Sequence, residues 1–296
     1  MSRTTAPDAH APDTDKRDSG LNWHAIGAIV RKDVTTVLRN KGVRTPLLVA
    51  PVIILIALPA FLVLGGELLA ASGQVPVDAQ GQTPFDRLAG PTATETTGID
   101  VNAPGGWERF VLEVFIAPLY LLVPLMVATV IAADSFAGER ERRTLEALLH
   151  TPTSDEELLV AKVLAAWLPA VTIGIGGFVV YSVVANVVAW PEFGRIFFPT
   201  LTWVLLGLWV TPGVAALGLG TMVIVSSRVD SLQAAHQIGS LIVLPVILLL
   251  IVQVSGTLLF NPVRVAGLGL LLWVSALLVL RIAAQHFRRE QLAVRM

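Results

Sequence analysis

The residues best suited to chemistry form one dense charged block in the middle of a very apolar chain. The run from Asp134 to Lys162 reads DSFAGERERRTLEALLHTPTSDEELLVAK. Its acidic and basic side chains recur three and four residues apart, a spacing that pairs opposite charges along a helix. A solvated loop is the alternative, because each exposed ion pair contributes only about 0.3–0.5 kcal/mol. We predict that the block docks a partner.

Motifs for catalysis or cofactor binding are missing from the sequence. It has no GxxxxGK[ST] phosphate-binding loop, no HExxH and no GxSxG. Its five histidines, at positions 10, 24, 150, 236 and 286, are scattered, and there is no cysteine. Metal sites in proteins are usually clusters of such side chains. We therefore predict no catalytic residue, metal or cofactor in this chain, and no nucleic-acid partner.

The composition is that of a membrane protein. Only 15% of the 296 residues are charged and 54% are apolar, whereas about 25% charged residues is usual in soluble domains. A spanning helix needs roughly 20 apolar residues. Arg281 falls within the last run and can extend to the interface. The apolar runs are 45–66, 114–133, 163–191, 196–227, 231–263 and 265–284. The predicted fold is an all-α integral membrane protein with six transmembrane helices within residues 45–285.

The distribution of basic residues predicts the orientation. Loops on the cytoplasmic side of a membrane are enriched in Lys and Arg. With the N-terminus inside, only Arg87, Arg109, Arg195 and Arg264 of the 21 basic residues lie outside. We predict a multi-pass protein of the cytoplasmic membrane with both termini in the cytoplasm.

An amphipathic helix is predicted before the first span, over residues 22–44. Apolar residues recur there at helical spacing on one face, with basic residues mostly opposite. The apolar face carries Trp23, Ile26, Val30, Val34 and Val37, and the basic residues are Arg31, Lys32 and Arg39. The helix either lies in the membrane interface or packs on the protein as an ordinary cytosolic helix.

Residues 1–21, polar and without an apolar core, are predicted to be a disordered cytoplasmic tail rather than a signal peptide. Residues 286–296 are predicted to be a second cytoplasmic tail.

Two connectors stand out between the spans. Residues 67–112, rich in Gly, Pro and Thr, show no helical or strand period, so they form an extracellular loop that is solvated or covers the outer mouth. Residues 134–161 are predicted to form a cytoplasmic helix–turn–helix. Pro152 stops its first helix, and Ser154 with Glu157 caps its second, which continues through Lys162 into the third span.

Polar side chains at membrane depth are sparse. Tyr181, Asn186 and Gln253 could line a path or could pack against backbone carbonyls of neighbouring helices. No Asp or Glu is expected deep in a helix, although ion-driven carriers usually keep such a group. We therefore expect the energy for transport to come from outside the chain. The fourth span also contains Gly207, Gly213, Gly218 and Gly220, which predict close helix packing.

The order of residues in the charged block resembles that of a known family. ADSFAGERERRTLEALLHTP followed by TSDEELLVAK is similar to the cytoplasmic loop between helices two and three of ABC-2 type permeases. The segment VLRNKGVRTP resembles the interfacial helix that precedes their first span. The matching positions in the loop are Glu139, Arg140, Glu141, Arg142, Thr144, Leu145, Glu146, Leu148, Leu149, Pro152 and Lys162.

Two departures from the family pattern bear on the subtype. Arg143 and Ala161 stand where Gly is common. The long outer segment lies between helices one and two, whereas better-known exporters elaborate the outer segment between helices five and six. The subtype most similar is the sodium-extrusion or multidrug-export permease.

The resemblance implies a function and a set of partners. Such permeases form homodimers or heterodimers, and each subunit docks a separate cytoplasmic ATPase that binds ATP and Mg²⁺. ATP-driven closure of the ATPase pair pushes on the loop and re-orients the helices to export substrate. The coupling residues would be Gly138, Glu139, Arg140, Glu141, Arg142, Arg143, Thr144, Leu145, Glu146 and Pro152.

Two other functions remain open from the sequence. A membrane scaffold would anchor a cytoplasmic partner without moving substrate, and it predicts a packed core with no polar path. An intramembrane enzyme needs paired polar catalytic residues at one depth, and none stand out. The sequence does not name a substrate.

Overall fold

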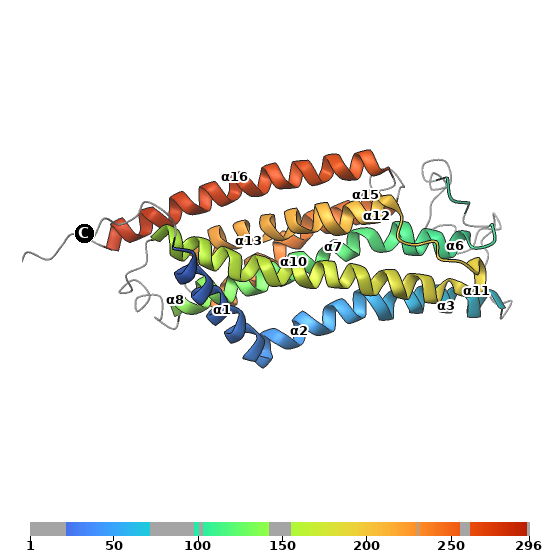
Figure 1. The fold of residues 1–296 in the computed structure, drawn as a ribbon, viewed down its shortest axis with the longest axis horizontal. Helices are drawn as coiled ribbons and strands as arrows, with labels where there is room; N and C mark the ends of the chain where they lie inside the picture. Colours follow the sequence, from blue (N-terminus) through green and yellow to red (C-terminus); the bar gives the residue numbers. More distant parts are fainter. Residues whose placement is uncertain are drawn as a thin grey trace, which may run out of the picture.

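The fold of this chain is an elongated bundle of helices (Figure 1). The computed structural model describes residues 22–71, 98–100, 103–141, 155–229, 231–254 and 261–294. Every regular element in these ranges is helical, which confirms the all-α prediction. The predicted tail over residues 1–21 lies outside the described residues.

The helices are interrupted by short turns of different pitch, labelled η. Of these, η1 to η4 are π-helical and η5 is a 3₁₀ turn. The first half of the bundle contains α1 (Trp23–Arg39), α2 (Lys41–Val52), η1 (Ile53–Ala57), α3 (Leu58–Ala71), α6 (Gly106–Arg109), η2 (Phe110–Phe115), α7 (Ile116–Ala133), η3 (Asp134–Gly138) and α8 (Glu139–Glu141). The second half contains α10 (Asp155–Val188), α11 (Trp190–Phe193), α12 (Leu201–Leu205), η4 (Leu206–Val210), α13 (Thr211–Ser227), α14 (Leu232–Gly239), η5 (Ser240–Val243), α15 (Leu244–Val254) and α16 (Pro262–Val294).

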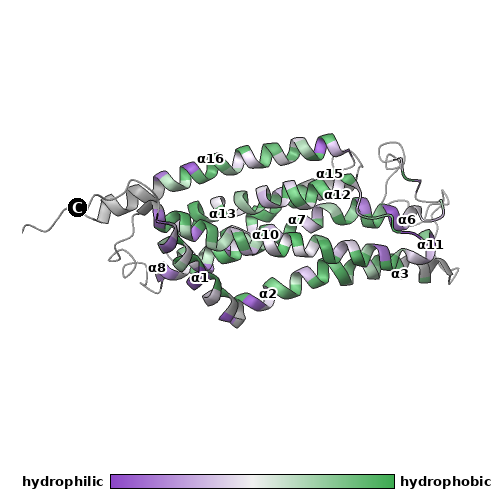
Figure 2. Cartoon of the chain, viewed as in Figure 1, coloured by the Kyte–Doolittle hydropathy of each residue, from purple (hydrophilic) through white to green (hydrophobic). Residues whose placement is uncertain are grey.

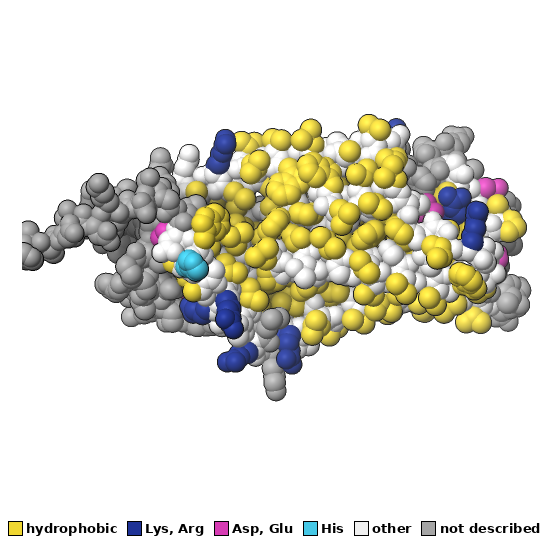
Figure 3. Space-filling model, in the orientation of Figure 1, with side chains coloured by type: hydrophobic (Ala, Val, Ile, Leu, Met, Phe, Trp, Pro, Cys, Tyr) yellow, Lys and Arg dark blue, Asp and Glu magenta, His cyan; other side chains and the backbone are white. Residues whose placement is uncertain are grey.

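Five helices in the described ranges are long and apolar enough to cross a membrane. They run over Val43–Gly66, Gly106–Gly138, Glu157–Val188, Leu201–Ser227 and Pro262–Gln285. Their apolar residues form a band along the middle of the bundle, and hydrophilic residues gather toward its two ends (Figures 2 and 3). These helices agree with the predicted positions of spans one to four and six, and the chain is a multi-pass membrane protein.

The region of the predicted fifth span is built from shorter pieces. An apolar helix runs over Leu232–Leu248, with the 3₁₀ turn η5 inside it, and α15 continues to Val254. Residues 255–260 of the predicted span lie outside the described residues.

The spans of α7 and α13 are the most buried, and the other spans pack around them. Small residues allow the close approach, as the sequence predicted for the fourth span. A Cβ added to Gly218 would lie 2.5 Å from Leu125 Cδ1, and one added to Gly207 would lie 2.8 Å from the Phe178 ring. Close contact between backbones is the usual basis of helix association in membranes.

Three of the π-helical turns precede prolines. Proline lacks an N–H and its ring collides with the carbonyl four residues earlier, so a wider turn relieves the clash. The turn η1 precedes Pro59, η2 precedes Pro118 and η4 precedes Pro212.

Side chains from neighbouring helices supply hydrogen bonds to carbonyls around these turns. Tyr181 donates its hydroxyl to Leu112 O at 2.6 Å, and the Trp203 indole donates to Glu113 O at 3.0 Å. A carbonyl left without a partner in hydrocarbon costs several kcal/mol, so such bonds make the irregular turns tolerable. This agrees with the expectation that internal prolines need support from neighbouring helices.

Three boundaries differ from the sequence prediction. The amphipathic helix ends at Arg39 rather than at residue 44, because extended backbone at Asn40 breaks it and the next helix, α2, already begins at Lys41. The segment predicted as a loop over residues 67–112 is helical at both ends, in α3 and from Gly106 onward. The charged block does not start a new helix, because the helix from Gly106 runs without a break to Glu141.

The helix of the second span also contains an acidic residue, Glu113. It lies two turns inside the span that starts at Gly106 and is buried. Arg109 Nε lies 3.3 Å from Glu113 Oε1, one helical turn earlier. This local pair allows the helix to continue through residues that the sequence pattern assigned to the loop.

We predict that Gly174→Ala destabilises the bundle. Its Cβ would lie 2.6 Å from Thr211 Cγ2 and 3.2 Å from Pro124 Cβ, both on rigid neighbours. Overpacking of this kind costs about 1–3 kcal/mol. The measurement is the melting temperature of the purified protein in detergent.

Gly176→Ala is the matched control on the same helix, because a Cβ there meets nothing within 4 Å. Its melting temperature should equal or slightly exceed that of the wild type, since Ala is the better helix former. Equal melting temperatures for the two variants would contradict the packing argument.

Candidate functional site

A buried ionic cluster joins three helical segments at the end of the bundle where α1 lies. Its centre is Lys162, near the start of α10, whose side chain is 0% exposed. Lys162 Nζ lies 2.5 Å from Glu139 Oε2, donates to Ser135 O at 2.9 Å, and lies 3.9 Å from Asp33 Oδ2. The ammonium also lies 5.5 Å from the centre of the Phe136 ring. The cluster therefore connects α10 with α1 and with both η3 and α8.

A lysine can be buried this completely only if its charge is paired and its donors are used. Two carboxylates and one backbone carbonyl meet that need here. Removing one partner of such a buried pair costs about 3–5 kcal/mol, because the other charge is left uncompensated. The cluster therefore fixes the relative positions of the segments that carry it.

Asp33 is the weakest connection in the cluster. Its Oδ2 is buried, forms no hydrogen bond within the described residues, and is held by Lys162 at 3.9 Å. Its Oδ1 lies 3.6 Å from Nζ of the exposed Lys32. Long-range attraction falls slowly with distance. A small shift of α1 relative to α10 would therefore cost less than breaking the short Lys162–Glu139 contact.

The charged block also holds the start of α14. Glu141 Oε2 accepts a hydrogen bond from Leu232 N at 2.8 Å, and Ser231 Oγ accepts one from Ala234 N at 3.1 Å. Both bonds satisfy N–H groups of the first turn of α14, which have no partner within the helix. Displacement of α8 would therefore act directly on α14.

The amphipathic helix packs along α10. Ile26 and Val37 of its apolar face are buried, whereas Trp23 is 64% exposed. The N–H of Asn22 donates to Glu157 Oε1 at 2.8 Å, which ties the start of α1 to the first turns of α10. Arg31, Lys32 and Arg39 are exposed, and basic side chains gather at this end of the molecule (Figure 3).

The structure describes only some of the predicted coupling residues. Gly138 is buried in η3, and Glu139 and Glu141 contact Lys162 and α14 as described. Arg140 lies in α8, and its side chain is outside the described part of the chain. Arg142, Arg143, Thr144, Leu145, Glu146 and Pro152 lie outside the described residues.

The predicted path residues have packing roles where they are described. Tyr181 is fully buried, stacks on Trp203 with ring centres 4.8 Å apart, and hydrogen-bonds Leu112 O. Asn186 binds the segment after α11 and lines a surface groove. Gln253 lies in α15, and its side chain is outside the described part.

The sequence analysis missed two residues that join helices, Asp33 and Tyr120. Asp33 recurs at helical spacing with Ile26 and Val37, so a charged residue on the apolar face of the helix was the available signal. Tyr120 is one of two tyrosines in the chain. Its hydroxyl lies 3.0 Å from Gly174 O and 2.8 Å from Thr211 Oγ1, which ties α7, α10 and α13 together at the middle of the bundle.

The contacts of the site join helices that are far apart in the sequence. In the described ranges, no three His, Cys, Asp or Glu side chains come together in a way that could hold a metal ion. Ion pairs and hydrogen bonds tie α1, α10 and α14 to the charged block.

Comparison with known protein families identifies a match. The family described as ABC-2 family transporter protein matches residues 27–287, which is almost the whole chain. No curated protein matches the chain.

We predict that Lys162→Met destabilises the protein by about 3–5 kcal/mol, because the buried Asp33 and the half-buried Glu139 lose their shared cation. Lys32→Met is the matched control, since Lys32 is 57% exposed and faces the same Asp33. It should change stability by less than about 0.5 kcal/mol. Both are measured by reversible unfolding in mixed detergent.

A triple variant, Lys162→Met with Asp33→Asn and Glu139→Gln, removes every charge of the cluster. It should recover part of the stability lost in the single variant, because no unpaired charge remains. If Lys162→Met were as stable as the wild type, the cluster would not hold the helices together.

Proposed function

The chain belongs to the ABC-2 family of transporter proteins, and from this we propose that it is the permease subunit of an ATP-driven exporter. The ATPase would be a separate cytoplasmic subunit that binds ATP and Mg²⁺. This division of labour is supported by the sequence, which has no GxxxxGK[ST] loop in its 296 residues.

The proposed topology has six spans with both termini in the cytoplasm. Five of the six spans correspond to the long apolar helices of the bundle, and α14 with α15 would be part of the remaining one, the fifth in chain order. The placement of α1 and the charged block in the cytoplasm is supported by the basic residues, which are concentrated at this end. The exposed Arg31 and Lys32 on α1 would then lie among lipid headgroups while the opposite face packs on α10.

We assign the coupling of ATP hydrolysis to the block from Gly138 to Pro152. The ATPase would contact the arginines at positions 140, 142 and 143. The observation that carries the proposal is the burial of Lys162 between Glu139, Ser135 and Asp33. A push on α8 would reach α10 and α1 through Lys162, and α14 through Glu141.

In this proposal Glu139 and Glu141 would not be part of the docking surface to which the sequence analysis assigned them. Both side chains bind residues of the same chain, so they would carry force inward rather than contact the ATPase. The docking contacts would be left to the arginines and to the rest of the block.

The transport path would lie between two permease subunits. Within the described core, aromatic and aliphatic side chains fill the space between α7, α10 and α13. Because this packing leaves no room for a polar path within one subunit, the path would form between the two subunits of a homodimer or heterodimer. The same packing suits a scaffold that anchors a partner without transport, and this is the second candidate.

The test of the coupling proposal is reversal of charge in the block. The tagged full-length chain is purified from its native membrane, and Mg²⁺-dependent ATP hydrolysis by copurified protein is measured. We expect Arg140→Glu with Arg142→Glu to lower the copurified activity at least tenfold, as like-charge contacts at an interface cost several kcal/mol. Arg264→Glu, a charge reversal at the opposite end, should leave it unchanged.

Two further measurements distinguish a loss of ATPase docking from misfolding, and an exporter from a scaffold. An unchanged melting temperature shows that the double variant is folded, so a loss of ATPase reflects docking. Substrate-stimulated ATP hydrolysis in liposomes separates the exporter from the scaffold, which would retain the ATPase without stimulation. Normal activity in the double variant would contradict the coupling assignment.

A further inference from the structure

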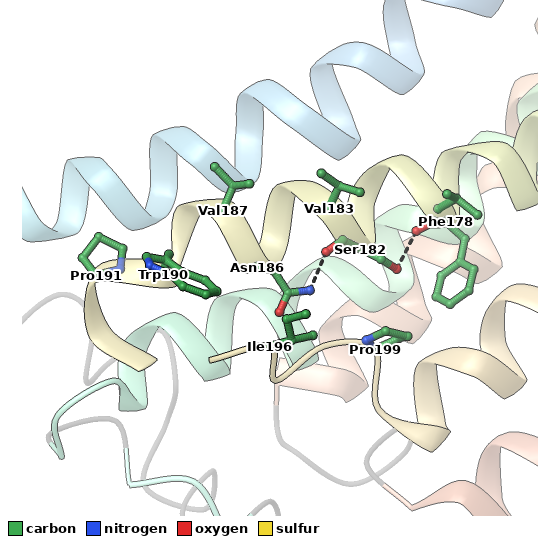
Figure 4. Close-up of a pocket in the computed structure, with 10 residues that line it drawn as sticks. Phe178, Ser182, Val183, Asn186, Val187, Trp190, Pro191, Ile196 and Pro199 are labelled. Carbon is green, nitrogen blue, oxygen red and sulfur yellow. Dashed lines mark hydrogen bonds between the residues drawn. The ribbon is translucent and has the colours of Figure 1, made fainter. Parts of the chain in front are cut away.

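A long apolar groove lies on the surface of the bundle at the end opposite α1. Its volume is about 730 Å³, and its walls are the last turns of α10 and the segment that follows α11 (Figure 4). Val183, Val187 and Trp190 form one wall, and Ile196 and Pro199 belong to the other. Its size is in the range of ligand-binding pockets.

The groove has the length of one leaflet of a bilayer. Its lining on α10 runs from Phe178 to Val187, which corresponds to about 14 Å at 1.5 Å per residue. The hydrocarbon core of a bilayer is about 30 Å thick, so one leaflet contributes about 15 Å. An acyl chain lying along α10 would therefore match the groove in direction and in length.

The second wall of the groove is rigid. Asn186 donates to Phe198 O and to Ser182 O, both at 2.7 Å, and its Oδ1 accepts from Phe197 N at 3.0 Å. These bonds hold the segment after α11 against α10. A preformed groove binds its ligand with a smaller entropic cost than one that must close around it.

A polar pocket of about 330 Å³ continues the groove. The two share Ile196, and the pocket is also lined by Arg109, Glu113, Arg195 and Thr200. Arg109 pairs with Glu113 at 3.3 Å. Arg195 is exposed and makes no hydrogen bond or ion pair with any residue that the structure describes, and the Thr200 hydroxyl is also without a partner there. The pocket therefore keeps one uncompensated positive charge next to the apolar groove.

We propose that the groove and the pocket together bind one anionic phospholipid. An acyl chain lies along Val183 and Val187, and the headgroup phosphate contacts Arg195 and Thr200. The juxtaposition of an apolar groove with an unpaired arginine selects an amphiphile of negative charge over a purely apolar ligand. The proposal does not depend on the transport function.

A second copy of the chain suits this groove less well. Helix interfaces in membranes favour small residues that let backbones approach, whereas the groove face of α10 carries valines at positions 179, 183 and 187, and Trp190 of α11 follows them. An arginine buried against a second copy would also need an acidic partner.

The experiment is native mass spectrometry of the full-length protein with added phosphatidylglycerol or phosphatidylcholine. The wild type should retain phosphatidylglycerol in preference to phosphatidylcholine. Arg195→Gln should weaken retention of phosphatidylglycerol roughly fivefold, the effect of one basic residue near an anionic surface. Val183→Trp fills the groove and should reduce retention of both lipids.

Two control variants lie outside the site. Arg264→Gln removes a basic residue elsewhere, and Leu270→Trp adds bulk to an exposed position of α16. Both should retain lipid as the wild type does.

Two results would overturn the proposal. One is equal retention of both lipids that Arg195→Gln leaves unchanged. The other is a Val183→Trp variant that changes from dimer to monomer with lipid retention intact, which would show that a second copy covers the groove. Neither measurement involves ATP, so failure here leaves the transport proposal standing.

Discussion

The arrangement of one end of this molecule depends on the burial of a single ammonium group. Lys162 is removed from water and has to be surrounded by acceptors, and these come from α1, η3 and α8. Segments far apart in the sequence are thereby brought to one point, and each loses stability if it moves away. The short Lys162–Glu139 contact holds the charged block strongly against α10. The longer Lys162–Asp33 contact lets α1 shift relative to α10 at a smaller energetic cost.

The sequence predicted the helical class and most spans, because an apolar run of membrane length has few alternative structures. It did not predict the cluster, because ionic partners separated by many residues leave no local pattern. Glu139 was assigned to a docking surface from its place in a charged run, yet it points to Lys162. The boundary error at residue 112 has a related cause, since Glu113 ends the apolar run but pairs with Arg109 within the helix.

The middle of the bundle is held by backbone carbonyls rather than by charges. Prolines and π-helical turns leave carbonyls exposed, and the side chains of Tyr181, Trp203 and Thr211 bind them from neighbouring helices or from the same one. In hydrocarbon these bonds have no competition from water, so each is costly to lose. The same side chains fill the core, so Tyr181, for which the sequence left a path-lining role and a packing role open, is used for packing. The side chains that bind carbonyls at the irregular turns are thus also the ones that close the core.

One helix, α10, passes both the ionic cluster at one end of the molecule and the apolar groove at the other. α10 runs unbroken from Asp155 to Val188, about 51 Å at 1.5 Å per residue, and passes Lys162 near its start and the apolar groove near its end. A continuous helix of this length transmits an axial shift or a tilt more readily than loops do, because its hydrogen bonds resist stretching. A displacement imposed on Lys162 would therefore change the position of Asn186 and of the segment it binds. If the proposed lipid binds in the groove and the proposed ATPase acts on the ionic cluster, both would act on α10, so occupancy of the groove would alter the energy needed to move this helix.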